Sequence, residues 1–128
     1  MPRDAVPMLN VPDVAATAAW YQGIGFELVD SADDEGRVTW ALMRFGEGEV
    51  MFNAGGSPSA ARRRDVDLFC YVSDVDAWFG EVADQGELVE GLHDTFYGLR
   101  EFTIRDCNRF WITFAAPLRP RSEQQLQH

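Results

Sequence analysis

The side chains that most often carry catalysis or hold a metal ion are scarce in this 128-residue sequence. It contains two histidines, His93 and His128, and two cysteines, Cys70 and Cys107. Neither cysteine has a histidine close to it in sequence, and no G-x-S-x-G motif is present to expose a nucleophilic serine. Two thiols are also too few for a zinc ribbon or a disulfide scaffold. The sequence therefore gives no indication of nucleophilic catalysis.

These four residues differ in their expected surroundings. Cys70 lies in the apolar run LFCYV and is expected in the core, whereas Cys107 lies in a turn and is expected to be exposed. His93 belongs to the segment GLHDTFYG, which we expect to be a loop. There it is either a plain surface residue or a ligand contact over a groove. His128 belongs to a polar C-terminal tail.

The charge balance limits the possible partners. The sequence carries 21 acidic and 11 basic residues, a formal net charge of −10. Because nucleic-acid binding needs a basic surface, we expect no nucleic-acid partner. An acidic surface favours cationic ligands, although solubility alone also explains it. No apolar run approaches the ~20 residues that cross a bilayer, and MPRDAVPMLN does not resemble a secretion signal, so we expect no membrane partner and a cytoplasmic location.

An internal repeat organises the chain. The segment 11–14 (VPDV) recurs 61 residues later as 72–75 (VSDV). Asp13 and Asp74 are suited to cap helices, because a carboxylate accepts hydrogen bonds from the free amides of the first turn. Residues at i, i+3, i+4 and i+7 then share one helix face. These residues are Val14, Thr17, Ala18 and Tyr21 in the first repeat and Val75, Trp78, Phe79 and Val82 in the second.

Strands are expected around both helices. Gly25 and Gly86 follow the helices, where glycine tolerates the left-handed conformation. The predicted strands are 4–11, 26–31, 37–45 and 48–53 in the first half, and 66–72, 87–91, 99–105 and 110–115 in the second. The sequence thus predicts an α+β fold of two βαβββ modules, whose curled mixed sheets form a concave groove.

The domain boundaries follow from this pattern. We expect a single domain over residues 1–117, with modules at 4–53 and 66–116. The segment 54–65 (AGGSPSAARRRD) is expected to be a solvated linker, and 118–128 a polar tail. Sheets of this kind leave unpaired edges and an open face, so we also expect a homodimer.

Two stretches carry a resemblance to a known family: AVPMLNVPDVAATAAWYQGIGFELV and YGLREFTIRDCNRFWITF. The first is similar to the opening, and the second to the final hairpin, of the vicinal-oxygen-chelate superfamily. This superfamily includes glyoxalases, bleomycin-resistance proteins and extradiol dioxygenases, and the sequence most resembles the bleomycin-resistance type. The resemblance covers about residues 4–116. The turn at 106–109 (DCNR) lacks the family's usual proline and glycine, which leaves the fold assignment intact but allows a different turn.

Metal-dependent members of this family hold a divalent ion with His, Gln or Glu on inward-facing strand positions. The resemblance places these positions at Val6, Met51, Asp67 and Thr113, with a register uncertainty of one residue. The slipped register offers Val50 or Phe52, and Ile112 or Phe114. Of all these only Asp67 has a ligand-type side chain. Because catalytic zinc needs about three protein ligands, we expect neither a metal ion nor another cofactor.

Without a metal ion, the concave sheet face is expected to be a mostly apolar ligand pocket. Its aromatic rings would stack on planar groups and attract cations. Asp67 would be unpaired there unless a cationic ligand or an arginine meets it. The candidate lining residues are Trp40, Met51, Asp67, Phe69, Tyr97, Trp111 and Thr113. Core packing is the alternative for Trp40, Met51, Phe69 and Trp111. Arg100 and Glu101 form an ion pair, a dimer contact or part of the site.

The resemblance and the charge together suggest a function. The leading hypothesis is a metal-free binding protein of the bleomycin-resistance type, which sequesters a cationic, partly aromatic small molecule such as bleomycin. Catalytic residues are not expected in that case. The alternative is an enzyme, a divergent metal-dependent glyoxalase-type or dioxygenase-type lyase or isomerase, using Asp67, His93 or Glu101. A regulatory module without a small ligand is a third possibility.

Overall fold

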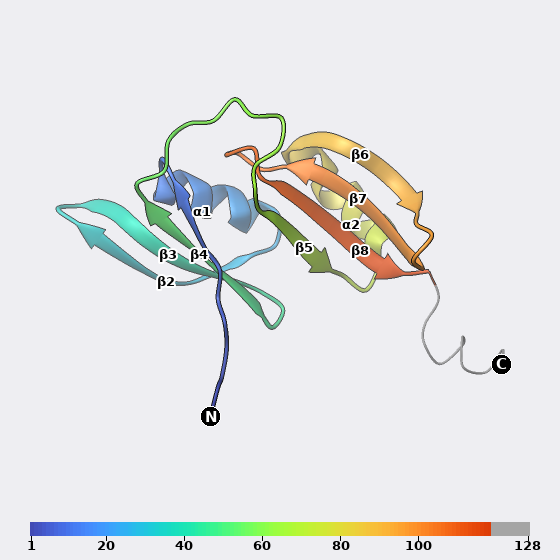
Figure 1. Ribbon diagram of the computed structural model, residues 1–128, viewed down its shortest axis with the longest axis horizontal. Helices are drawn as coiled ribbons and strands as arrows, with labels where there is room; N and C mark the ends of the chain where they lie inside the picture. Colours follow the sequence, from blue (N-terminus) through green and yellow to red (C-terminus); the bar gives the residue numbers. More distant parts are fainter. Residues whose placement is uncertain (119–128) are drawn as a thin grey trace. The chain divides into compact units, whose positions relative to one another are not determined.

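The computed structural model of the chain, shown in Figure 1, describes residues 1–118. The chain divides into two compact units, unit 1 (Met1–Ala60) and unit 2, which begins at Ala61. Each unit contains a four-stranded sheet and one α-helix, so the predicted α+β fold of two βαβββ modules is confirmed. No helix among residues 1–118 has the length and apolar character needed to span a membrane. The tail predicted at 118–128 lies outside the described residues, except for Leu118.

Unit 1 is a mixed sheet with a helix against one face (Figure 1). Its elements are β1 (Met8–Val11), α1 (Val14–Gly23), β2 (Glu27–Asp34), β3 (Arg37–Phe45) and β4 (Gly48–Ala54). The strand order is β1-β4-β3-β2, in which β1 pairs with β4 in parallel and the other pairs are antiparallel.

The residues that begin and end α1 behave as the sequence predicts. The Asp13 carboxylate accepts a hydrogen bond of 3.0 Å from the backbone amide of Ala16, which caps the first turn. The buried residues of the helix are Val14, Thr17, Ala18 and Tyr21, the face predicted from their spacing. Gly25 follows with φ = +101°, in the left-handed region that glycine adopts without steric cost.

Tyr21 fixes α1 to its sheet. Its ring centroid lies 4.7 Å from that of Phe52 in β4 and 5.0 Å from that of Phe26, and all three side chains are buried. Met51 and Asn53 are the strand neighbours of Phe52. Because side chains alternate along a strand, they lie on the opposite face of the sheet. That face carries no helix within unit 1.

Unit 2 repeats this arrangement. Its elements are β5 (Asp67–Tyr71), α2 (Val75–Val82), a short 3-10 helix η1 (Ala83–Gln85), β6 (Glu87–Asp94), β7 (Leu99–Arg105) and β8 (Trp111–Pro117). The strand order is β5-β8-β7-β6, with β5 parallel to β8 and the remaining pairs antiparallel. Asp74 caps α2 by accepting a hydrogen bond of 3.1 Å from the amide of Ala77, as predicted.

Two predictions about unit 2 are wrong. Gly86 does not end α2 in a left-handed conformation, because η1 continues the chain after Val82 and Gly86 is extended, with φ = −131°. His93 lies in β6 rather than in a loop, paired with Glu101 of β7. The register of β6 shifts twice between Leu88 and His93, so the strand lacks the regular alternation that reveals a strand in sequence.

Aromatic rings build the core of unit 2. Phe102 and Phe114 are fully buried side by side, with ring centroids 5.3 Å apart, and Phe79 of α2 meets Phe102 edge-on at 5.0 Å. Cys70 is buried and Cys107 exposed, as predicted. Burial disfavours the charged thiolate and raises the pKa of Cys70 to about 12.

Asp106 organises the turn between β7 and β8, which lacks the family's usual proline and glycine. Asp106 Oδ1 accepts hydrogen bonds from the amides of Asn108 and Phe110, at 2.7 and 2.8 Å. Arg109, at the position where the family usually has glycine, takes a left-handed φ of +70°. Its side chain donates from Nε to the Ala61 carbonyl oxygen at 2.6 Å, which offsets part of the steric cost of that conformation.

Candidate ligand-binding site

The sheet of unit 2 has one face that α2 does not cover. Because Phe102 and Phe114 face α2, their strand neighbours point the other way. We call this second side the open face of unit 2. From the strand register it comprises Asp67, Phe69 and Tyr71 of β5, Trp111, Thr113 and Ala115 of β8, Glu101, Thr103 and Arg105 of β7, and Glu87, Glu90 and His93 of β6. Four of the seven predicted lining residues belong to it.

Exposed rings mark one edge of this face. Phe69 is 47% exposed and Tyr71 65% exposed, with ring centroids 5.3 Å apart. Tyr97, in the loop between β6 and β7 at the other end of this face, is also exposed. Large apolar side chains gathered on the surface of a water-soluble domain are typical of binding surfaces. Phe69 is thus a surface residue rather than the core residue that the sequence also allowed.

The chain itself already engages Asp67 and Trp111. Arg63 forms an ion pair with Asp67, and its guanidinium carbon lies 4.2 Å from the Trp111 ring centroid. The backbone carbonyl of Arg62 accepts hydrogen bonds of 3.0 Å from Trp111 Nε1 and from Arg105 Nε. Asp67 therefore has the arginine partner that its sequence position required.

The arginines at 62–64, in the segment expected to be a solvated linker, also make specific contacts within unit 2. Besides Arg62 and Arg63, Arg64 lies over the Phe110 ring at 4.3 Å and donates a 2.9 Å hydrogen bond to the Asn108 carbonyl oxygen. The planar guanidinium groups stack on aromatic faces, a contact that composition alone does not reveal.

At the other end of the open face, polar groups gather around Glu101. Glu101 is only 7% exposed, and its Oε1 accepts a 2.7 Å hydrogen bond from the Tyr97 hydroxyl. This bond to a carboxylate raises the pKa of Tyr97. His93 Nε2 lies 3.7 Å from Glu101 Oε1 and 3.5 Å from Glu90 Oε1. Tyr97 thus joins the open face from its loop.

Arg100 and Glu101 do not pair with each other, although the sequence left that possibility open. They are consecutive in β7, so their side chains point to opposite faces. Arg100 instead bonds Asp76 at 3.0 Å and Asp94 at 2.8 Å. Strand alternation was the available signal that Glu101, and not Arg100, belongs to the open face.

Trp40 and Met51 belong to unit 1. Trp40 pairs with Asn53, and Met51 pairs with both Leu42 and Met8. Strand alternation therefore places Trp40 and Met51 together on the face opposite α1, and both are half-buried. The structure thus divides the predicted lining residues between two sheets, two on unit 1 and five on unit 2.

The strand register also bears on the metal positions. Met51 pairs with Met8 on the face of unit 1 opposite α1, and Thr113 pairs with Phe69 on the open face of unit 2. The Thr113 hydroxyl shares a 2.8 Å hydrogen bond with Thr103. The slipped alternatives Val50, Phe52, Ile112 and Phe114 are all buried beneath the helices. Within residues 1–118, no three His, Cys, Asp or Glu side chains are grouped in a way that would hold a metal ion.

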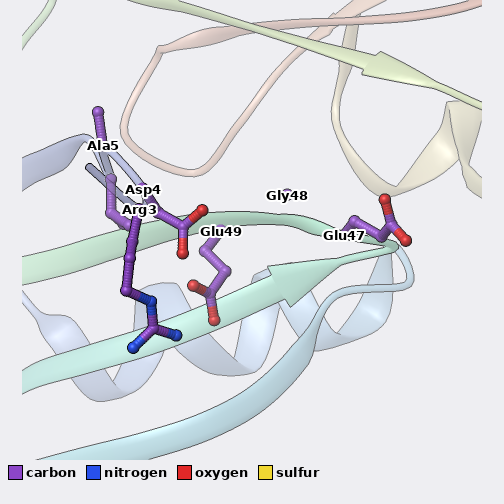
Figure 2. A pocket seen from close by; sticks show the side chains of 7 residues that line it. Arg3, Asp4, Ala5, Glu47, Gly48 and Glu49 are labelled. Atoms are coloured by element: carbon purple, nitrogen blue, oxygen red, sulfur yellow. The ribbon is translucent and has the colours of Figure 1, made fainter. Parts of the chain in front are cut away.

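A polar hollow lies elsewhere, on unit 1. It has a volume of about 270 Å³ and is open to solvent. Figure 2 shows Arg3, Asp4 and Ala5 on one side, and residues 47–49, from the β3–β4 turn and the start of β4, on the other. Val6 also lines it, ahead of β1. Apart from Val6, none of the residues considered for a metal ion or a ligand contributes to this hollow.

The chain was compared with known protein families. Residues 5–114 match the model of the Glyoxalase/Bleomycin resistance protein/Dioxygenase superfamily. The chain belongs to this superfamily. The resemblance found in the two sequence stretches is therefore confirmed. No curated protein sequence matches the chain significantly.

Solved structures of this superfamily include both binding proteins and enzymes. TioX from Micromonospora sp. ML1 is 24% identical, with a TM-score of 0.71 over 92% of this chain and 98% of that one. A bleomycin-binding protein from Streptomyces verticillus, complexed with copper(II)-bleomycin, is 25% identical, with a TM-score of 0.66 over 91% and 97%. A glyoxalase/bleomycin resistance protein/dioxygenase family enzyme from Burkholderia phytofirmans PsJN is 18% identical, with a TM-score of 0.66 over 87% and 95%.

Proposed function

We propose that this protein binds a cationic, partly aromatic small molecule and sequesters it without chemical change. The observation that carries the proposal is the pairing of exposed rings, Phe69 and Tyr71, with a buried carboxylate, Glu101, on the open face of unit 2. Rings of this kind hold the planar part of a ligand by stacking, and the carboxylate meets its positive charge.

Charge and relatives both support this proposal. The net charge of −10 attracts cations and speeds their arrival. A superfamily relative from Streptomyces verticillus is a bleomycin-binding protein. Bleomycin, which combines positive charge with planar aromatic groups, is therefore the first ligand to test. Its sequestration would protect a cell from the drug.

The first experiment is a tryptophan-fluorescence titration of chelator-treated protein with metal-free bleomycin. Saturable quenching near one ligand per chain is expected, weakened by Phe69→Ala and by Tyr71→Ala. Leu88→Ala is a matched control, because Leu88 is 47% exposed like Phe69 but pairs with Ile104 on the helix-facing side. No response up to roughly millimolar ligand, an affinity weaker than about −4 kcal/mol, would refute bleomycin as the ligand.

The enzyme hypothesis, unlike metal-free sequestration, predicts a bound metal ion in the purified protein. A metal-dependent member would purify with one Mn, Fe, Ni or Zn ion per chain and would lose it on Asp67→Ala. Sequestration through rings and carboxylates instead predicts unchanged bleomycin affinity after chelation. Elemental analysis beside the titration therefore separates the two functions.

We also propose that two copies of the chain pair. Within residues 1–118, each sheet ends in strands with one unpaired edge, β1 and β2 in unit 1 and β5 and β6 in unit 2, and such edges favour association. Light scattering should give twice the chain mass of 14.4 kDa. A mass of 14.4 kDa at micromolar concentration would rule the pairing out.

A further inference from the structure

The Glu101 carboxylate is in an unusual position for a charged group. It lies on β7, in the middle of the sheet, and the residue is only 7% exposed. Tyr97 satisfies one carboxylate oxygen, Oε1. The other oxygen, Oε2, is buried and accepts no hydrogen bond from any group among residues 1–118. Buried polar atoms almost always have a partner, and an unpaired charged oxygen is among the most costly exceptions.

His93 and Glu90 lie next to the Glu101 carboxylate. His93 Nδ1 lies 2.8 Å from the Gly91 carbonyl oxygen, which can only accept, so Nδ1 carries the proton. His93 Nε2 faces Glu90 Oε1 at 3.5 Å and Glu101 Oε1 at 3.7 Å, which leaves Glu101 Oε2 without a partner among residues 1–118. Glu90, His93 and Glu101, which we call the acceptor cluster, therefore place two carboxylates around one imidazole, and Glu101 Oε2 has no donor among residues 1–118.

Asp67 shows how this chain satisfies a carboxylate on the same face. Its partner is the guanidinium of Arg63, which also covers the Trp111 ring at 4.2 Å. Among residues 1–118 no arginine pairs with Glu101, since the adjacent Arg100 points to the other face and bonds Asp76 and Asp94. A cation from outside the chain would take the corresponding place at Glu101.

We propose that the acceptor cluster binds the cationic N–H group of the ligand, an amidinium, guanidinium or primary ammonium, through Glu101 Oε2. Such groups present several N–H donors and positive charge, which matches a buried carboxylate oxygen that has no donor among residues 1–118. A planar aromatic substituent on the cation would lie against Tyr97, whose ring is exposed while its hydroxyl is held by Glu101. This inference rests on the proposed function and names the ligand chemistry that the site selects.

The rings of β5 set where the rest of the ligand would lie. Tyr71 and Glu101 both pair with Ala115, so they lie on either side of β8. Two strand spacings separate them by roughly 10 Å. The preferred ligand therefore carries its cationic nitrogen about 10 Å from a second planar group, the distance from Glu101 to the rings of Phe69 and Tyr71.

Benzamidine is the probe, and benzamide is its neutral counterpart of nearly the same shape. Each is titrated into ¹⁵N-labelled full-length protein, and binding is followed by amide chemical shifts. We expect benzamidine to shift the amides of β6 and β7 around His93 and Glu101 saturably, and benzamide to bind at least tenfold more weakly. Glu101→Gln should weaken benzamidine at least tenfold, because a charge-assisted hydrogen bond is lost.

Two further variants make the result specific. Glu81→Gln removes an exposed carboxylate from α2 and should leave benzamidine binding unchanged. Tyr97→Phe removes the hydroxyl but keeps the Glu101 charge, so binding should persist within about threefold while ring contacts remain. The dispersion of the amide spectrum shows directly that each variant is folded.

Several outcomes would overturn the proposal. These are equal binding of benzamidine and benzamide, shifts centred away from β6 and β7, or undiminished binding to folded Glu101→Gln protein. Displacement of benzamidine by stoichiometric Zn²⁺ held at His93 would also overturn it, in favour of a metal site. Benzamidine binding without bleomycin binding would leave this site standing and refute only the drug. Bleomycin binding that Glu101→Gln leaves unaffected would refute this site and leave bleomycin as the ligand.

Discussion

Replacing Glu101 with glutamine should stabilise the free protein. A buried acceptor without a partner costs about 1–3 kcal/mol, and more when it is charged. Glutamine keeps the shape and the oxygen that accepts from Tyr97, and it removes the buried charge. Its amide nitrogen is still unpaired, so only part of the cost is recovered. We expect a net gain of about 1 kcal/mol in the free energy of unfolding.

Urea unfolding followed by circular dichroism measures this gain. With a urea dependence of about 2 kcal/mol per molar, a 1 kcal/mol gain raises the midpoint by about 0.5 M. Glu81→Gln is the matched control, because an exposed carboxylate changes stability by less than about 0.5 kcal/mol. An unchanged or lower midpoint for Glu101→Gln would mean that Oε2 is already satisfied in the free protein, and it would remove the basis for a ligand cation there.

Three other predictions follow from the fold. Asp74→Ala removes the cap of α2 and should lower the free energy of unfolding by about 1 kcal/mol in the same urea assay, whereas an unchanged midpoint would contradict the cap. Because burial raises the pKa of Cys70 to about 12, its thiol stays protonated at pH 8, and a thiol reagent should label Cys107 alone until urea unfolds the protein. Rapid labelling of both thiols in native protein would contradict the burial. Arg63→Ala uncovers the Trp111 ring and should increase acrylamide quenching of its fluorescence, measured as the difference from Trp111→Phe, and equal quenching would disprove the stacking.

The sequence predicts the elements well where local chemistry decides the structure. Asp13 and Asp74 cap their helices because each carboxylate accepts a hydrogen bond from a free backbone amide of the first turn. The buried face of α1 follows from the i, i+3, i+4, i+7 spacing in its sequence, because that spacing places side chains on one side of a helix. Gly86 fails for the converse reason, since a glycine after a helix signals an end but does not specify whether a 3-10 turn comes first.

The candidate site is less predictable because its contacts are distant in sequence. The sequence left open whether a cationic ligand or an arginine meets Asp67, and the structure pairs it with Arg63. Nothing in a run of arginines indicates that one of them stacks on Trp111. Glu101 is a candidate ligand contact because it is buried and its Oε2 has no partner among residues 1–118. Both are properties of the packed sheet that the sequence does not reveal. His93 was placed in a loop because its strand is irregular.

The most direct test of the central claim is a map of where metal-free bleomycin binds. Amide spectra of ¹⁵N-labelled protein should show their largest saturable shifts on β5, β7 and β8, at residues of the open face such as Phe69, Tyr71 and Glu101. The amides of α2, on the other side of the same sheet, should move least. Saturable shifts centred on α2, or no shift up to roughly millimolar drug, would contradict the assignment of ligand binding to this face.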